Sequence, residues 1–244
     1  MTTLDSLADK MLLEMVEKKK EVFYKSFQHH FQDRAALHAL LEKLREEDQV
    51  NAIKLGFFYN IMTTNISNPG VTLICVFSIM EATAPEKFQS FDHWLLGEIK
   101  RNEEITFHID NKRSFKKTIS EFQRKYYETH GASMKVRNFI KRYFSLSDKK
   151  DLINGFMIKD TNIRTSFDAL TLNEKIKAIV DMLYRERSIF VHEAQLPQLS
   201  DNNKILASLR IKKTEKFVSV TISINKIQEM FEKAFLRYLR SKCI

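Results

Sequence analysis

Glycine and proline are scarce in this chain, with 5 Gly and 3 Pro among 244 residues. Because these residues supply most tight turns, their scarcity favours long helices joined by short polar loops. Strand-like alternation of apolar and polar residues occurs in one isolated region, residues 205–211 and 218–224, with a polar stretch between them. We therefore predict a mainly α protein with one small β-hairpin near the C-terminus, followed by a final helix capped by Asn225.

A helical segment is predicted to begin at Thr171, because Glu174 stands three residues later, as in a capping box. Apolar residues behind this cap recur at helical spacing and are predicted to form a buried stripe: Ile176, Ile179, Val180 and Leu183. One turn further, the stripe reaches Arg187, whose guanidinium must find an acceptor or line a cleft. His192 follows five residues later, and an imidazole can change charge near neutral pH. These two side chains are candidates for converging on one phosphate.

The pattern Tyr184-x-x-Arg187-Ser188-x-x-Val191-His192 resembles the signature of HEPN domains, an arginine followed several residues later by a histidine. The form with Arg-Ser and Val-His is most similar to the ApeA-like branch of that family. The resemblance implies a helical bundle that commonly dimerises, and many members are metal-independent endoribonucleases. In the family's best-supported nucleases the residue after the arginine is usually Asn, Asp or His, whereas here it is Ser188.

A polar loop at residues 63–70 is the best candidate for a domain boundary. It predicts an N-terminal helical region, residues 1–68, and a HEPN-like helical domain with the hairpin and final helix, residues 69–244. The run 71–82 is almost entirely apolar until Glu81, and a buried carboxylate needs a partner. HEPN domains often place a polar residue from an early helix beside the arginine and histidine, so the resemblance implies Glu81 for that place. An exposed carboxylate at a helix end is the alternative.

The chain is basic, with a formal net charge of +9 and a pI near 9.4, which indicates an anionic partner and nucleic acid first. An ordinary basic surface is the alternative, because 31 acidic residues are interspersed with 40 basic ones. Two predicted helices, residues 110–127 and 134–144, carry the basic side chains expected to contact RNA phosphates: Lys112, Arg113, Lys116, Lys117, Arg124, Lys135, Arg137, Lys141 and Arg142. Tyr126, Tyr127 or Tyr143 could stack on bases, although helical aromatics usually pack.

The spacing of cysteines and histidines predicts no metal and no cofactor. Cys75 and Cys243 are expected to be reduced thiols of a cytoplasmic protein. His29, His30 and His38 are close in sequence, but no carboxylate or cysteine completes a metal set, so we interpret them as polar residues at helix ends. Acidic residues interrupt the first hydrophobic stretch, and the longest apolar run is too short to span a bilayer. We therefore expect no signal peptide and no membrane partner.

RNA can be cut without a metal, because its own 2′-hydroxyl can attack the adjacent phosphorus. His192 suits general acid–base work and Arg187 suits a bidentate hold on phosphate oxygens, while Ser188 could donate one hydrogen bond. Because one histidine cannot easily act on both sides of phosphorus, a homodimer that unites two Arg187–His192 pairs is expected. We predict a metal-independent endoribonuclease of HEPN type.

The alternative is a non-catalytic HEPN module that binds RNA or a partner protein through its basic helices. In that module Arg187, Glu81 and His192 form a buried polar network that fixes helix packing. A helical DNA-binding regulator is disfavoured, because no helix-turn-helix pattern with a short glycine turn is evident.

Overall fold

The computed structural model describes residues 17–64, 69–84, 91–101, 115–158, 161–193, 206–211, 214–220 and 223–243. Helices dominate these residues, so the mainly α class predicted from the sequence is confirmed. After a helical segment at residues 17–27, the elements are η1 (Gln28–His30), α2 (Arg34–Glu42), α3 (Glu46–Thr64), α4 (Pro69–Ala82), α5 (Phe91–Arg101), α7 (Phe115–His130), α8 (Ala132–Tyr143), α9 (Leu146–Asn154), β1 (Phe156–Met157), α10 (Thr161–Asp168), α11 (Leu172–Glu193), β2 (Leu206–Ile211), β3 (Thr214–Val220) and α12 (Ile224–Arg240).

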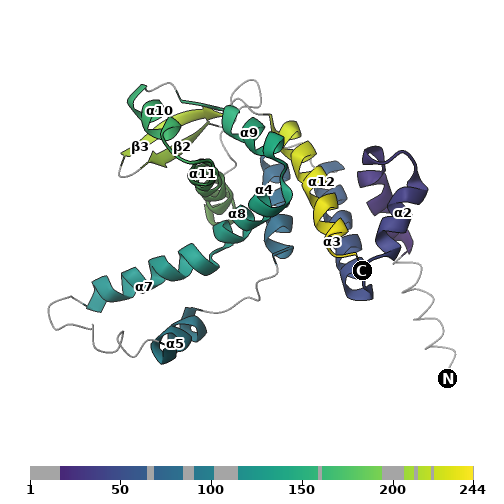
Figure 1. Cartoon of the computed structure of the whole chain (residues 1–244), viewed down its shortest axis with the longest axis horizontal. Coiled ribbons are helices and arrows are strands. Elements are labelled where there is room, and N and C mark those ends of the chain that lie inside the picture. Colours follow the sequence, from purple (N-terminus) through teal and green to yellow (C-terminus); the bar gives the residue numbers. More distant parts are fainter. Residues whose placement is uncertain are drawn as a thin grey trace.

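Helix α4 lies at the centre of the molecule (Figure 1). Residues 72–80 are all buried except for Ser78, which is half-buried. A helix that is apolar on every side is stable only where neighbouring elements cover every side. Helices α3, α8, α11 and α12 contact α4 and provide that cover. Among the residues described, no helix combines the length and the apolarity needed to cross a bilayer.

An aromatic cluster joins the N-terminal helices to α12. The Phe27 ring lies 5.5 Å from the Tyr59 ring and 5.4 Å from the Phe235 ring, measured between centroids. The Tyr59 and Phe231 rings are also 5.4 Å apart. These residues belong to one buried cluster that includes side chains from both sides of the predicted boundary. The boundary itself stays a prediction, because residues 65–68 lie outside the described part of the chain.

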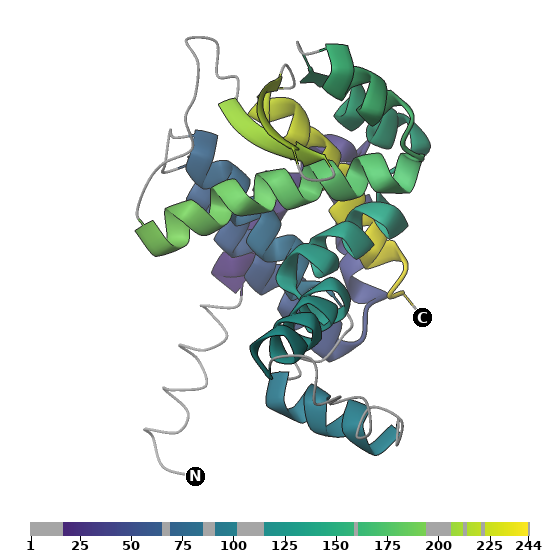
Figure 2. The ribbon, with the colours of Figure 1, turned by 90° about the vertical axis from the view of Figure 1, so that its left-hand side faces the viewer.

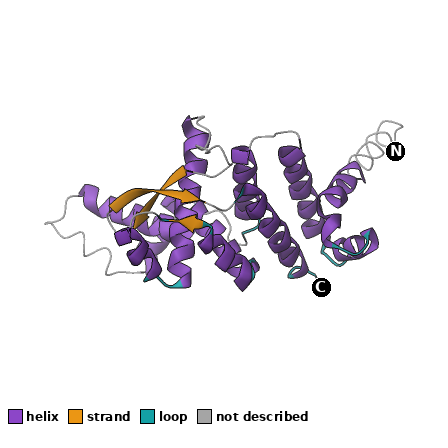
Figure 3. Cartoon of the chain, turned by 90° about the horizontal axis from the view of Figure 1, so that it is seen from above, coloured by secondary structure: helices purple, strands orange, loops and turns teal. Residues whose placement is uncertain are grey.

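The three strands form one antiparallel sheet in the order β1-β3-β2, at the end of the molecule opposite the N-terminal helices (Figure 3). Strands β2 and β3 pair from Leu206–Ser219 to Ile211–Thr214. The sequence predicted two strands here, but the structure adds the two-residue β1, which pairs with β3 at Phe156–Val220. A two-residue strand is too short to show an alternating pattern.

The final helix begins earlier than the sequence predicted. The Ser223 side chain, not Asn225, accepts the capping hydrogen bond, from the backbone N–H of Lys226. Ile224, which the alternating pattern placed in a strand, is the first residue of α12 and is buried. Burial of the Ile224 side chain in the core outweighs the preference for a strand that the alternating pattern indicated.

Gly131 sets the junction between α7 and α8. A Cβ at this position would collide with the Tyr127 carbonyl oxygen, so the two helices meet as closely as they do only because the residue is glycine. The junction brings α7 against α8, while α11 runs across α8 and α4 with β2 on its other side (Figure 2).

Candidate functional site

Helix α11 is built as its sequence predicted. The Thr171 backbone N–H donates to Glu174 Oε2 at 2.8 Å, and the Glu174 N–H donates to Thr171 Oγ1 at 3.4 Å, which completes the capping box. The predicted apolar stripe is buried throughout: Ile176, Ile179, Val180 and Leu183. This stripe seats α11 on the core, and Arg187 follows one turn beyond it.

Arg187 and Glu81 meet between α11 and α4. Arg187 Nη2 lies 3.5 Å from Glu81 Oε2, and each side chain is 19% exposed. Arg187 also donates from Nη1 to the Tyr184 hydroxyl at 2.9 Å and from Nη2 to Ser78 Oγ at 3.4 Å. In both helices the two participating residues are three positions apart, so they project from one face. The structure thus brings Glu81 to the arginine for which the sequence proposed it.

The electrostatics of this cluster favour a neutral tyrosine beside an ion pair. Burial and the charge of Glu81 raise the pKa of Tyr184 to about 12, although Arg187 acts in the opposite direction. The Tyr184 hydroxyl therefore keeps its proton at neutral pH. Glu81 Oε1 and Arg187 Nε are buried and have no hydrogen-bond partner within the described part of the chain. Such buried polar atoms are costly, so this pair is held under strain by the packing of α4 against α11.

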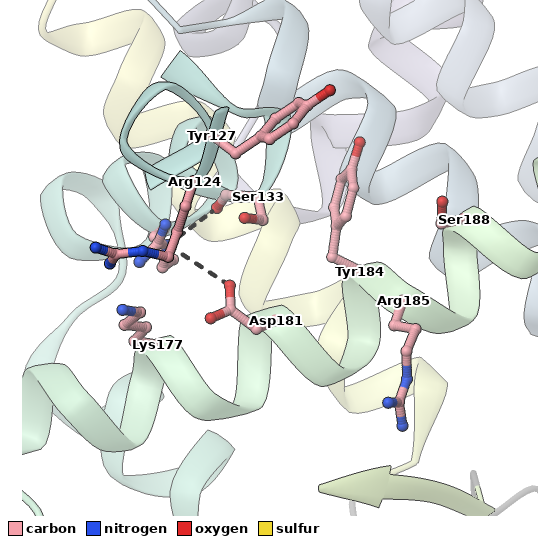
Figure 4. Close-up of a pocket in the computed structure, with 9 residues that line it drawn as sticks. Arg124, Tyr127, Ser133, Lys177, Asp181, Tyr184, Arg185 and Ser188 are labelled. Atoms are coloured by element: carbon pink, nitrogen blue, oxygen red, sulfur yellow. Dashed lines mark hydrogen bonds and ion pairs between the residues drawn. The ribbon is translucent and has the colours of Figure 1, made fainter. Parts of the chain in front are cut away.

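A cleft of about 500 Å³ opens beside this cluster, between α7, α8 and α11 (Figure 4). Four cationic side chains and one carboxylate belong to its lining, which consists of Arg124, Tyr127, Ser133, Arg137, Lys177, Asp181, Tyr184, Arg185 and Ser188. Tyr184 is shared with the Arg187 cluster, and Ser188 is the residue directly after Arg187. The cleft therefore places a positive surface next to the Arg187–Glu81 pair.

Two contacts position Arg137 in the cleft. Its Nε donates to the Ser133 carbonyl oxygen at 3.4 Å and lies 3.8 Å from Asp181 Oδ1. The contact with Asp181 links α8 to α11, and the contact with Ser133 holds the guanidinium against its own helix. Asp181 also lowers the net positive charge of the lining, which leaves three cationic side chains in excess.

The predicted RNA-binding residues do not all reach this cleft. Arg124 and Arg137 do, whereas Lys135 and Arg142 line a separate, narrow pocket beside Thr83, and Lys141 is exposed on α8. Lys112 and Arg113 lie outside the described residues, as do the side chains of Lys116 and Lys117 in α7. Contact of Lys135, Lys141 and Arg142 with RNA phosphates therefore stays a prediction, and it would take place outside this cleft.

Two cations of the cleft, Lys177 and Arg185, were not predicted, because the basic residues expected to bind RNA were all placed in residues 110–127 and 134–144. A signal was present in the spacing. Residues 177, 181, 184 and 188 recur at intervals of three and four, so they share one face of α11. Only the packing of α7 and α11 on α8 decides that this face meets Arg124 and Arg137.

One of the three candidate stacking tyrosines faces solvent. Tyr127 is 63% exposed and lines the cleft. Tyr126 is instead buried, with its ring 5.5 Å from that of Trp94. Tyr143 is half-buried against the core, 5.1 Å from Phe139 and 5.5 Å from Tyr238. Burial of the Tyr126 ring disfavours a stacking role for that residue, whereas stacking by Tyr127 or Tyr143 stays a prediction.

The His192 side chain lies outside the described part of the structure, although residue 192 belongs to α11. Its predicted convergence with Arg187 therefore stays a prediction. Glu186 is a titratable residue of the same helix that the sequence reasoning did not single out. Burial raises the pKa of its carboxyl, against the opposing effect of Arg185.

The histidines of the N-terminal region have the carboxylate partner that the sequence seemed to lack. His29 Nε2 and His30 Nε2 lie 3.0 and 2.8 Å from Glu232 Oε2 in α12. The expectation that no carboxylate completes a set with these histidines is therefore wrong for these two, although both lie at a helix end in η1. His38 stays apart, 3.3 Å from Glu42 on its own helix. The missed signal is Glu232 itself, a carboxylate on the otherwise apolar face of α12.

The chain matches no protein-family model, no curated protein and no solved structure.

Proposed function

We propose that the protein is a metal-independent endoribonuclease of HEPN type, which binds RNA in the cleft between α7, α8 and α11. One observation carries the proposal: the basic cleft shares Tyr184 with the cluster that holds Arg187. A strand whose phosphates lie along Arg124, Arg137 and Lys177 would therefore pass next to the signature arginine. Tyr127 offers an exposed ring beside that path for a base to stack on.

The reaction needs only proton transfer and charge stabilisation. The 2′-oxygen attacks phosphorus, the bond from phosphorus to the 5′-oxygen breaks, and a 2′,3′-cyclic phosphate remains. His192 takes the proton of the 2′-hydroxyl, and His192 of a second copy protonates the departing 5′-oxygen. Arg187 stabilises the phosphorane charge through its guanidinium. Glu81 holds the guanidinium in place, and Ser188 donates one hydrogen bond.

A non-catalytic HEPN module is the second candidate, and the burial of Arg187 favours it. The guanidinium is 19% exposed and already engages Glu81, Tyr184 and Ser78. In this alternative the pair fixes α4 against α11, and the basic cleft binds RNA or a partner protein without cutting it.

The two candidates are separated by incubating purified protein with RNA in excess chelator. The nuclease should leave 2′,3′-cyclic phosphate ends and spare an RNA whose scissile nucleotide is 2′-deoxy. His192→Ala should lower turnover about 10²- to 10⁴-fold while most RNA binding persists, because general acid–base catalysis contributes about that much. Arg187→Lys should also be severe, since lysine keeps the charge but loses the planar fork.

His38→Ala and Arg164→Lys are the matched controls, because both side chains are exposed and neither lines the cleft. If His192→Ala cuts RNA as fast as the parent at equal purity, the nuclease mechanism is excluded. Lower thermal stability in the Arg187→Lys and His192→Ala proteins, with no cutting by the parent, would establish the non-catalytic module. Light scattering that finds a monomer with and without RNA would exclude the two-copy active site.

A further inference from the structure

Two histidines and a glutamate form a second cluster of chemically capable side chains, separate from the cleft. His29 and His30 end the first described helical segment in η1, and both direct Nε2 at the same oxygen of Glu232. These three ligand atoms lie within 4.8 Å of one another. None of the three residues belongs to the Arg187 cluster or to the cleft lining.

We propose that His29, His30 and Glu232 bind one divalent transition-metal ion, Zn²⁺ first. Two imidazoles and one carboxylate are a common three-residue set for Zn²⁺, with a fourth position left for water. Zinc bonds of about 2.0 to 2.1 Å place neighbouring ligand atoms about 3.3 Å apart in a tetrahedral site. The two nitrogen–oxygen separations here are 3.0 and 2.8 Å, so an ion can enter after small side-chain rotations.

The surroundings of Glu232 prepare one of its oxygens for a cation. The Tyr59 hydroxyl donates to Oε1, which leaves Oε2 directed at the two imidazoles. Such a hydrogen bond to the second oxygen is the usual support of a ligating carboxylate.

Burial explains why this carboxylate favours a metal ion. The Glu232 side chain is 8% exposed, beside the aromatic rings of Phe231 and Phe235 on the same helix. A buried carboxylate is costly unless positive charge compensates it, and a divalent ion held by the two imidazoles would supply that charge. The His29 side chain is 57% exposed, which leaves an entry path for the ion and room for a water ligand.

The bound ion would connect η1 to α12 across more than two hundred residues of sequence, and so hold the N-terminal helices on the core. A ligand that binds only the folded chain raises its melting temperature. Chelation should therefore lower the melting temperature of the full chain, and this effect is independent of whether RNA is cut.

The test uses the purified full chain, stripped with chelator and titrated with Zn²⁺ by calorimetry and with Co²⁺ by visible absorption. We expect one ion per chain, a Co²⁺ spectrum with nitrogen and oxygen ligands, and a higher melting temperature with Zn²⁺. His29→Ala should lower the Zn²⁺ affinity at least about 100-fold, and Tyr59→Phe about 10- to 100-fold, since losing a supporting hydrogen bond has that effect. His38→Ala is the matched control and should bind as the parent does.

His29→Ala decides the outcome, because its exposed imidazole can be removed without opening the core. Circular dichroism equal to that of the parent will show that this variant is folded. The proposal is overturned if the parent binds neither ion at micromolar concentration. It is equally overturned if His29→Ala and Glu232→Gln bind Co²⁺ as tightly as the parent and His38→Ala do.

Discussion

At the scale of single residues, burial decides which groups are unusual. The Glu186 carboxyl is half-buried in α11, and its pKa is raised because burial disfavours its charged form. A raised pKa means that the folded chain holds this proton more tightly than the unfolded chain does. The free energy of unfolding therefore falls as the pH rises from the unfolded pKa, about 4.3, through the higher folded value.

Glu186→Gln should remove the free-energy cost of burying the charged carboxylate. We expect a higher melting temperature than the parent's at pH 7 and no difference near pH 4 and below, where the glutamate is protonated in both states. Thermal unfolding followed by circular dichroism across this range checks the prediction. Glu47→Gln, an exposed change on α3, should show no such gain. A gain that stays constant with pH would contradict the assignment to charge burial.

At the scale of elements, short helices depend on their ends. Helix α9 has nine residues, too few to be stable alone. A complete capping box closes its N-terminus, with Ser145 Oγ accepting from the Asp148 N–H at 3.1 Å and Asp148 Oδ2 accepting from the Ser145 N–H at 3.0 Å. Arg237 of α12 donates to the same Oδ2 at 2.9 Å, which links this cap to the core.

The cap also gives the stability of the molecule a pH dependence. Burial acts to raise the pKa of Asp148, but hydrogen bonds from Ser145 and Arg237 outweigh it and lower the pKa. Stability from this carboxylate is therefore present above the unfolded pKa and is lost as the pH falls through the folded value.

Ser145→Ala should lower the free energy of unfolding by about 1 kcal/mol at pH 7, the usual cost of a lost N-cap. The loss should shrink in acid, where Asp148 is protonated and the box is already broken. Urea unfolding at several pH values measures both effects. Ser147→Ala is exposed on the same helix and should be neutral or slightly stabilising, because alanine is the better helix former. Equal losses in the two variants would contradict a capping role.

At the scale of the whole molecule, the net charge of +9 is less informative than its placement. Four of the described basic residues belong to the lining of one cleft between α7, α8 and α11. Phosphate contacts release counterions, so each contact adds about 0.7 to the salt slope of single-strand binding.

Arg124→Glu and Lys177→Glu should therefore weaken RNA binding and lower that salt slope by at least about 0.7 each. Fluorescence anisotropy with a labelled single strand, repeated between low and physiological salt, gives both quantities. Lys54→Glu makes the same change of charge on α3, which does not line the cleft, and should leave the slope unchanged. An equal loss in all three variants would show that net charge, and not the cleft, governs binding.

The sequence by itself determined the helical class and the cap and buried stripe of α11. It named Glu81 as a candidate partner of the arginine, with an exposed helix-end carboxylate as the alternative. These are local properties, because helical spacing and capping involve residues a few positions apart. The scarcity of Gly and Pro and the isolated alternating region are also read directly from the sequence, and they predicted a mainly α fold with one hairpin.

Only the tertiary structure decided which faces meet. It brings Glu232 to His29 and His30 across 203 and 202 positions, and it turns the Lys177 face of α11 towards α7 and α8. It also adds β1 to the sheet. These contacts depend on how side chains pack between elements that are far apart in the sequence. The residues around each position do not indicate which distant residue it will contact.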